Sequence, residues 1–68
     1  MPHSITERVQ RAVQRRGRGS VFVPTDFLAL GSRAAIDVAL HRLVRSGVIR
    51  RLARGVYDFP IQHPVLGD

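Results

Sequence analysis

The chain contains no cysteine, no lysine and no tryptophan among its 68 residues. Without cysteine it can form neither a disulfide nor a thiolate metal site. No apolar run approaches the roughly 20 residues that a membrane-spanning helix needs. The first residues, "MPHSITERVQ", lack the apolar core of a signal peptide. We therefore expect a cytoplasmic protein without a membrane partner.

Negative charge is also scarce. Eleven basic residues, all arginine, stand against five acidic ones, which gives a formal net charge of +6 and a pI near 11.8. The planar guanidinium fork of arginine suits phosphate groups and guanine edges. This charge predicts a polyanionic partner, with nucleic acid as the first expectation.

Local signals divide the chain into short elements. Ser4 and Glu7 form a capping box before an apolar stripe, and Gly17 is a natural stop. The longest helical pattern begins after its cap, Ser32, and ends before Gly47. The predicted helices are Ile5–Arg16, Asp26–Leu30 (capped by Thr25) and the segment between Ser32 and Gly47. The predicted strands are Val21–Val23, Val48–Leu52 and Val56–Phe59.

The order helix, short strand, helix, helix, hairpin predicts an α+β fold that is mostly α. It is the layout of a winged helix-turn-helix: three helices, a small antiparallel hairpin as the wing and a short edge strand. We expect residues 1–60 to form this domain. Residues 61–68 are interpreted as an extended linker or as the truncated start of a C-terminal domain.

In such a fold the second helix of the helix-turn-helix enters the major groove of double-stranded DNA. Arg33 suits a guanine edge, and Asp37 suits a cytosine amino group or an ion pair with Arg33 or His41. Because a single small module buries little surface, a homodimer on inverted repeats is expected. The candidate recognition residues are Ser32, Arg33, Ala34, Asp37, Val38, His41 and Arg42.

The hairpin supplies the wing candidates Arg50, Arg51 and Arg54. A two-residue turn would pair Arg51 with Asp58, whereas a turn with a glycine bulge would pair Arg50 with Asp58. Arg54 lies at the tip in either register. The arginines of the first helix are interpreted as a solvated face.

Catalysis finds no support in the sequence. The three histidines, His3, His41 and His63, are far apart, and no metal-ligand spacing occurs. We expect no catalytic residues, no metal and no cofactor. Two alternatives to DNA binding stay open, namely a winged helix that contacts only proteins and one that binds RNA.

The segments "VFVPTDFLALGSR" and "ALHRLVRSGVIRRLARGVYDFP" resemble the N-terminal winged-helix domain of AbiEi-type antitoxins, from type IV toxin–antitoxin systems. The resemblance spans roughly Ile5 to Pro60. It implies a transcriptional repressor that binds the operator of its own operon, with a functional link to a nucleotidyltransferase toxin. Members of that family carry a further C-terminal domain with the antitoxin role, and this chain stops where that domain would begin.

Overall fold

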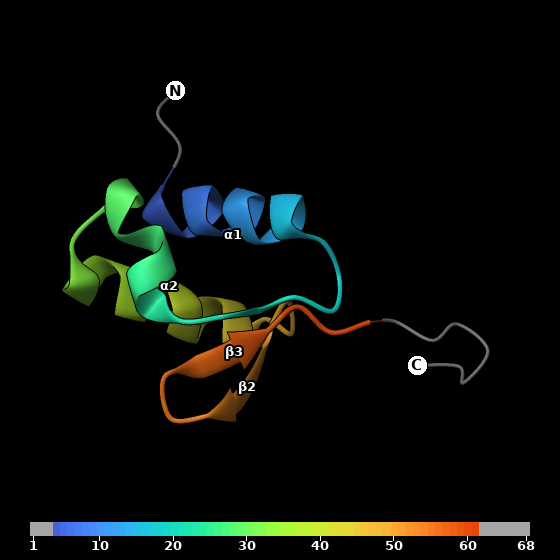
Figure 1. Ribbon diagram of the computed structural model, residues 1–68. Coiled ribbons are helices and arrows are strands. Elements are labelled where there is room, and N and C mark those ends of the chain that lie inside the picture. The colour runs from blue at the N-terminus through green and yellow to red at the C-terminus, as the bar shows by residue number, and fades with distance from the viewer. Residues whose placement is uncertain (1–3, 62–68) are drawn as a thin grey trace.

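A computed structural model describes residues 4–61 of the chain. The described part holds three helical segments and a three-stranded antiparallel sheet (Figure 1). This confirms the predicted fold class, an α+β, mostly helical, winged-helix-like fold. In chain order the elements are α1 (Ile5–Arg16), β1 (Val21–Phe22), η1 (Pro24–Leu30), α2 (Arg33–Arg45), β2 (Arg50–Ala53) and β3 (Val56–Asp58).

Helix α1 has the predicted bounds. The hydroxyl of Ser4 accepts a hydrogen bond from the Glu7 backbone N–H at 3.1 Å, so the predicted cap forms. The helix ends at Gly17, whose N–H donates to the carbonyls of Val13 and Gln14. Both signals act within one helical turn, which is why the sequence locates this element well.

The second helix differs from the prediction. It is a 3-10 helix that begins at Pro24, not Asp26, and Thr25 does not cap it. Instead, the carboxylate of Asp26 accepts a hydrogen bond from the Val23 N–H at 2.9 Å. Proline suits the first position of a helix because it needs no hydrogen bond there. The expected β1 is correspondingly shorter and ends at Phe22.

The 3-10 geometry also decides which side chains of η1 are buried. With about three residues per turn, Pro24, Phe27 and Leu30 fall on one face. Pro24 and Phe27 are buried and Leu30 is half-buried. Leu28 lies off this face and is 47% exposed.

Helix α2 begins after Ser32, whose hydroxyl accepts from the Ala35 N–H at 3.2 Å, as predicted. It ends in a Schellman motif. Gly47 has φ +82°, its N–H donates to the Val44 carbonyl, and the Val48 N–H donates to the Leu43 carbonyl. A backbone with positive φ favours glycine, so the predicted stop at Gly47 is confirmed.

Strands β2 and β3 form the predicted hairpin with shifted bounds. The N–H groups of Val48 and Ile49 both donate to the Leu43 carbonyl, so these residues close the helix and β2 starts only at Arg50. Strand β3 ends at Asp58, one residue earlier than predicted. The sheet order is β1–β3–β2.

The hairpin takes the bulged register. Arg50 lies opposite Asp58, Arg51 lies opposite Tyr57, and the pairing shifts by one residue before Ala53. Gly55 has φ +73° in the turn, a conformation that residues with a Cβ atom rarely adopt. Of the two alternatives left open by the sequence, the structure therefore selects the Arg50–Asp58 pair.

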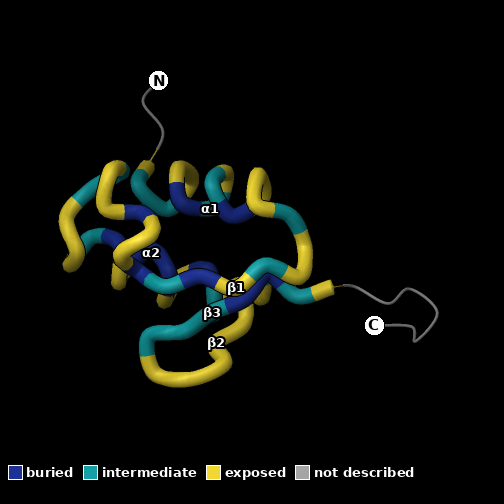
Figure 2. The backbone as a smooth tube through the Cα atoms, viewed as in Figure 1, coloured by how far each residue is buried: buried dark blue, intermediate teal, exposed yellow. Residues whose placement is uncertain are grey.

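The core lies between the helices and the inner face of the sheet (Figure 2). Phe22 packs edge-on against Phe27, with ring centroids 5.4 Å apart, and stacks on the half-buried Tyr57. These rings pack in or against the core and do not form an exposed stacking platform. The buried apolar residues are Val9, Val13, Phe22, Phe27, Ile36, Ala39, Leu40, Leu43, Ile49 and Phe59.

Helix α2 packs against α1 and η1. The hairpin lies on the side of α2 opposite to α1 (Figure 1). The outer face of α2 stays uncovered. Across residues 4–61, no helix is long and apolar enough to cross a membrane. The predicted linker, apart from Ile61, lies outside the described residues.

Candidate nucleic-acid interface

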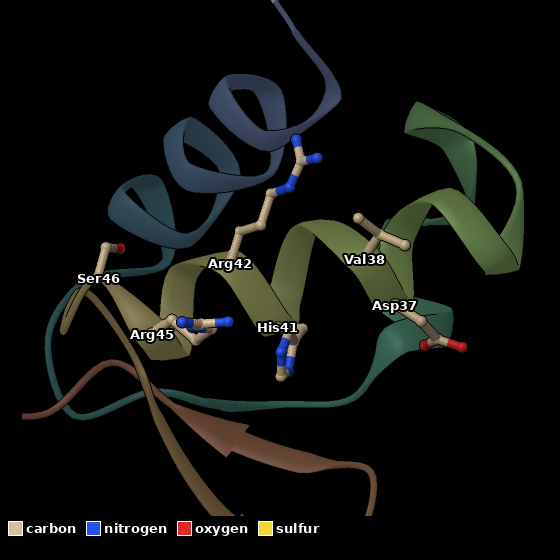
Figure 3. A pocket seen from close by; sticks show the side chains of 6 residues that line it. All are labelled: Asp37, Val38, His41, Arg42, Arg45 and Ser46. Atoms are coloured by element: carbon tan, nitrogen blue, oxygen red, sulfur yellow. The ribbon is translucent and has the colours of Figure 1, made fainter.

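The outer face of α2 carries an open hollow of about 660 Å³. In Figure 3, Arg42 extends on the side of α1, whereas His41 extends on the side of the hairpin. Four of the seven predicted recognition residues thus lie together. The hollow is lined by Asp37, Val38, His41, Arg42, Arg45 and Ser46.

Arg45 and Ser46 belong to this face but were not among the predicted recognition residues. Arg45 lies one helical turn after His41, at the i+4 position, and therefore on the same face of the helix. The spacing was present in the sequence. The predicted set ran from Ser32 to Arg42 and stopped before the last residues of the helix, because the N-terminal residues of a recognition helix lead into the groove.

The other three predicted recognition residues lie at the N-terminus of α2, outside the hollow. The Ser32 hydroxyl caps the helix. Ala34 is exposed. Arg33 pairs with Asp37, which lines the hollow: its Nε donates to Asp37 Oδ1 at 3.2 Å.

The Arg33–Asp37 ion pair is the i,i+4 pair that the sequence offered as one alternative. Both side chains are more than half exposed, at 57% and 51%, so the pair contributes little to stability, under about 0.5 kcal/mol. Within residues 4–61 the two terminal amino groups of Arg33 donate to no other protein group. The carboxylate therefore orients the guanidinium and leaves its outer edge open.

In the hairpin, Arg50 and Asp58 form a two-pronged ion pair. Arg50 Nε donates to Asp58 Oδ1 at 3.1 Å and Nη2 to Oδ2 at 2.8 Å. The Asp58 side chain is only 10% exposed, whereas that of Arg50 is 61% exposed. A largely buried carboxylate needs such a partner, because it has lost its water. The guanidinium of Arg50 is therefore held within the sheet by Asp58.

The hydrogen bonds to Asp58, together with its charge, raise the pKa of the Arg50 guanidinium. A raised folded-state pKa stabilises the fold at every pH below the unfolded-state value and loses its effect only as pH rises through the folded value. For an arginine that window lies at strongly alkaline pH. The positive charge of Arg50 is thus permanent under ordinary conditions.

The other two wing candidates keep their charge available. Arg54 is exposed at the tip of the hairpin and, within residues 4–61, has no hydrogen bond or ion pair. Arg51 is exposed and donates from Nε to the carbonyl of Ala53 at 3.4 Å, a long contact that leaves its charge uncompensated.

Acidic side chains neutralise only some of the arginines. Besides the two pairs above, Asp26 lies 3.7 Å from Arg16 at the far end of α1. Among residues 4–61, no ion pair reaches the free arginines of α2 and the hairpin. We call these four the interface arginines: Arg42, Arg45, Arg51 and Arg54.

Metal-ligating side chains are sparse in the same region. Across the part of the chain that the structure describes, no group of three or more His, Cys, Asp or Glu side chains gathers. His41 is the one histidine within residues 4–61, and it lies on the outer face of α2. What the arrangement offers chemically is an exposed set of cationic hydrogen-bond donors beside one exposed apolar side chain, Val38.

Comparison with known proteins places the chain in a family without assigning it an activity. No curated protein and no solved structure matches it. A protein family does match, over residues 8–68, which takes in most of α1 and every later element. The chain therefore belongs to DUF6088, a family of unknown function.

Proposed function

We propose that this domain binds double-stranded DNA, with α2 in the major groove and the β2–β3 hairpin as a wing. The observation that carries the proposal is the position of the interface arginines. All four lie on the two elements with which a winged helix contacts DNA, and none has an acidic partner within residues 4–61. Neutralising phosphates with such arginines releases counterions, which drives association.

The arginines take different roles in this complex, according to their positions. Arg33, oriented by Asp37, presents the outer edge of its guanidinium to a guanine. Arg42 and Arg45 flank the hollow and contact phosphates on either side of the groove. Arg54 reaches the minor groove or a phosphate from the hairpin tip, while Arg50 supports the hairpin through Asp58.

The biological context of the proposal is transcriptional repression. It rests on the resemblance of residues 5–60 to the AbiEi-type antitoxin domain, because the description of DUF6088 carries no function. On this reading the domain represses the operon that encodes it, as part of a type IV toxin–antitoxin system. Two copies on an inverted repeat would supply the affinity that one small module lacks.

The test begins with selection of bound duplexes from a random-sequence library. Fluorescence anisotropy then compares the enriched duplex with a scrambled one. We expect Arg33→Ala to abolish the preference and Arg42→Ala to weaken both duplexes alike. Arg16→Ala, which removes an arginine that already has a partner, serves as the matched control and leaves both affinities unchanged. If the protein bound no duplex at all, the proposal would be refuted.

A protein-contact module is the second candidate, because Val38 lines the hollow and is 50% exposed. It predicts that enriched and scrambled duplexes bind equally weakly and that Val38→Ser has no effect on DNA affinity. An RNA hairpin that competes better than duplex DNA of equal length would instead favour RNA binding.

A further inference from the structure

Helix α1 carries a second basic surface, separate from the interface arginines. Arg8, Arg11 and Arg15 follow each other at i, i+3 and i+7, so they share one flank of the helix. Together with Gln14 and Leu30 they line a depression of about 500 Å³. We call these three arginines the α1 surface. None of its residues lines the hollow on α2.

One acidic side chain, Glu7, lies on α1, four residues before Arg11. Within residues 4–61, Asp26, Asp37 and Asp58 pair with arginines elsewhere, and no ion pair reaches Arg8, Arg11 or Arg15. Like charges at i and i+4, such as Arg11 and Arg15, destabilise a helix by about 0.2–0.5 kcal/mol. The three arginines outnumber the one acid of α1, and a bound polyanion would reduce the repulsion among them.

The spacing of the α1 surface suits a phosphate backbone. Seven residues separate Arg8 from Arg15, which places them about 10 Å apart along the helix axis at about 1.5 Å per residue. One strand of duplex DNA carries a phosphate every ~3.4 Å of its own axis. A row about 10 Å long is therefore of the same scale as a few successive phosphates of one strand.

We propose that the α1 surface binds the backbone of a second segment of duplex DNA, without base preference. This inference rests on the proposed function, in which α2 and the hairpin hold the first segment. In Figure 1, α1 and the hairpin lie on opposite sides of α2. One molecule therefore joins two duplexes, or two distant segments of one duplex.

The test is a capture assay. A short biotinylated duplex on beads is mixed with a fluorescent duplex of the same length, with and without protein. We expect the wild type to retain the fluorescent duplex. The triple variant Arg8→Gln, Arg11→Gln, Arg15→Gln should lower retention at least tenfold while its affinity for a single duplex, measured by anisotropy, stays within twofold. Circular dichroism checks that the variant is folded.

Two further variants separate the explanations. Replacing the same three arginines by lysine keeps the charge and should restore retention. The double variant Arg42→Gln, Arg45→Gln should lower single-duplex affinity and retention together. If no duplex binds the wild type, the proposed function itself fails.

Three results would overturn the inference alone. Wild-type protein that binds single duplexes but captures no second duplex shows that the α1 surface does not bridge. Undiminished retention by the triple glutamine variant would assign bridging to association between copies of the chain, which sedimentation would reveal. A poly-glutamate peptide that binds the wild type more tightly than duplex, and loses that binding in the triple variant, would assign the α1 surface to an acidic protein.

Discussion

Removal of the charge at the hairpin tip, by Arg54→Gln, should change how DNA affinity depends on salt. If each of the four interface arginines neutralises one phosphate, the slope of log K against log salt is about −3.6, at about −0.9 per phosphate. Between 50 and 200 mM salt the wild type then loses about 150-fold in affinity. The variant keeps three contacts, so its slope should be about −2.7 and its loss about 40-fold.

The assay is anisotropy of a labelled duplex titrated at four or more salt concentrations. Arg16→Gln is the control, because it changes the net charge by the same amount but removes an arginine that lies 3.7 Å from Asp26. Its slope should equal that of the wild type. Equal slopes for Arg54→Gln and the wild type would refute the wing contact. Equally reduced slopes for both variants would show that net charge, and not the hairpin, determines the binding.

Three other substitutions test the hairpin and its neighbour α2. Asp37→Asn removes the acid on the outer face of α2, so affinity for random duplexes should rise several-fold, and lower affinity for them would contradict this. Urea denaturation should show a stability loss under about 0.5 kcal/mol, because the lost pair is exposed. Gly55→Ala should lower stability by about 1–2 kcal/mol, since alanine resists the positive φ, and no atom lies within 4 Å of the added Cβ to add a clash. If the Gly55→Ala variant unfolded at the same urea concentration as the wild type, the turn would have adopted another backbone conformation without cost. Arg50→Met should lower the melting temperature by leaving the largely buried Asp58 without a partner, and adding Asp58→Asn should recover part of the loss. A double variant less stable than Arg50→Met would contradict the burial argument.

Local signals account for most of what could be predicted. The bounds of α1 and the caps of α2 depend on Ser4, Ser32 and Gly47, each of which acts on backbone groups within one turn. The sequence was less informative about η1. Its residues permit either an α-helix or a 3-10 helix. The structure has the 3-10 helix, in which Phe27 packs against Phe22 and Leu28 is exposed.

The candidate site shows the same division. The composition established an arginine surplus, and helical spacing placed Asp37, Val38, His41 and Arg42 on one face of α2. Spacing also allowed the Arg33–Asp37 pair, since both residues belong to one helix. It did not single out Arg45 for the hollow, nor did it separate the α1 surface from an ordinary solvated face.

The sequence by itself determined the element order, the helix caps and the excess of positive charge, because these depend on composition and on neighbours within about one helical turn. Only the tertiary structure decided which arginines remain free. The choice between Arg50 and Arg51 as the partner of Asp58 depended on the register of two strands, and the Arg16–Asp26 pair on how α1 packs against η1. Ion pairs between separate elements require that the chain first bring those elements together, and burial of Asp58 then makes one pairing necessary.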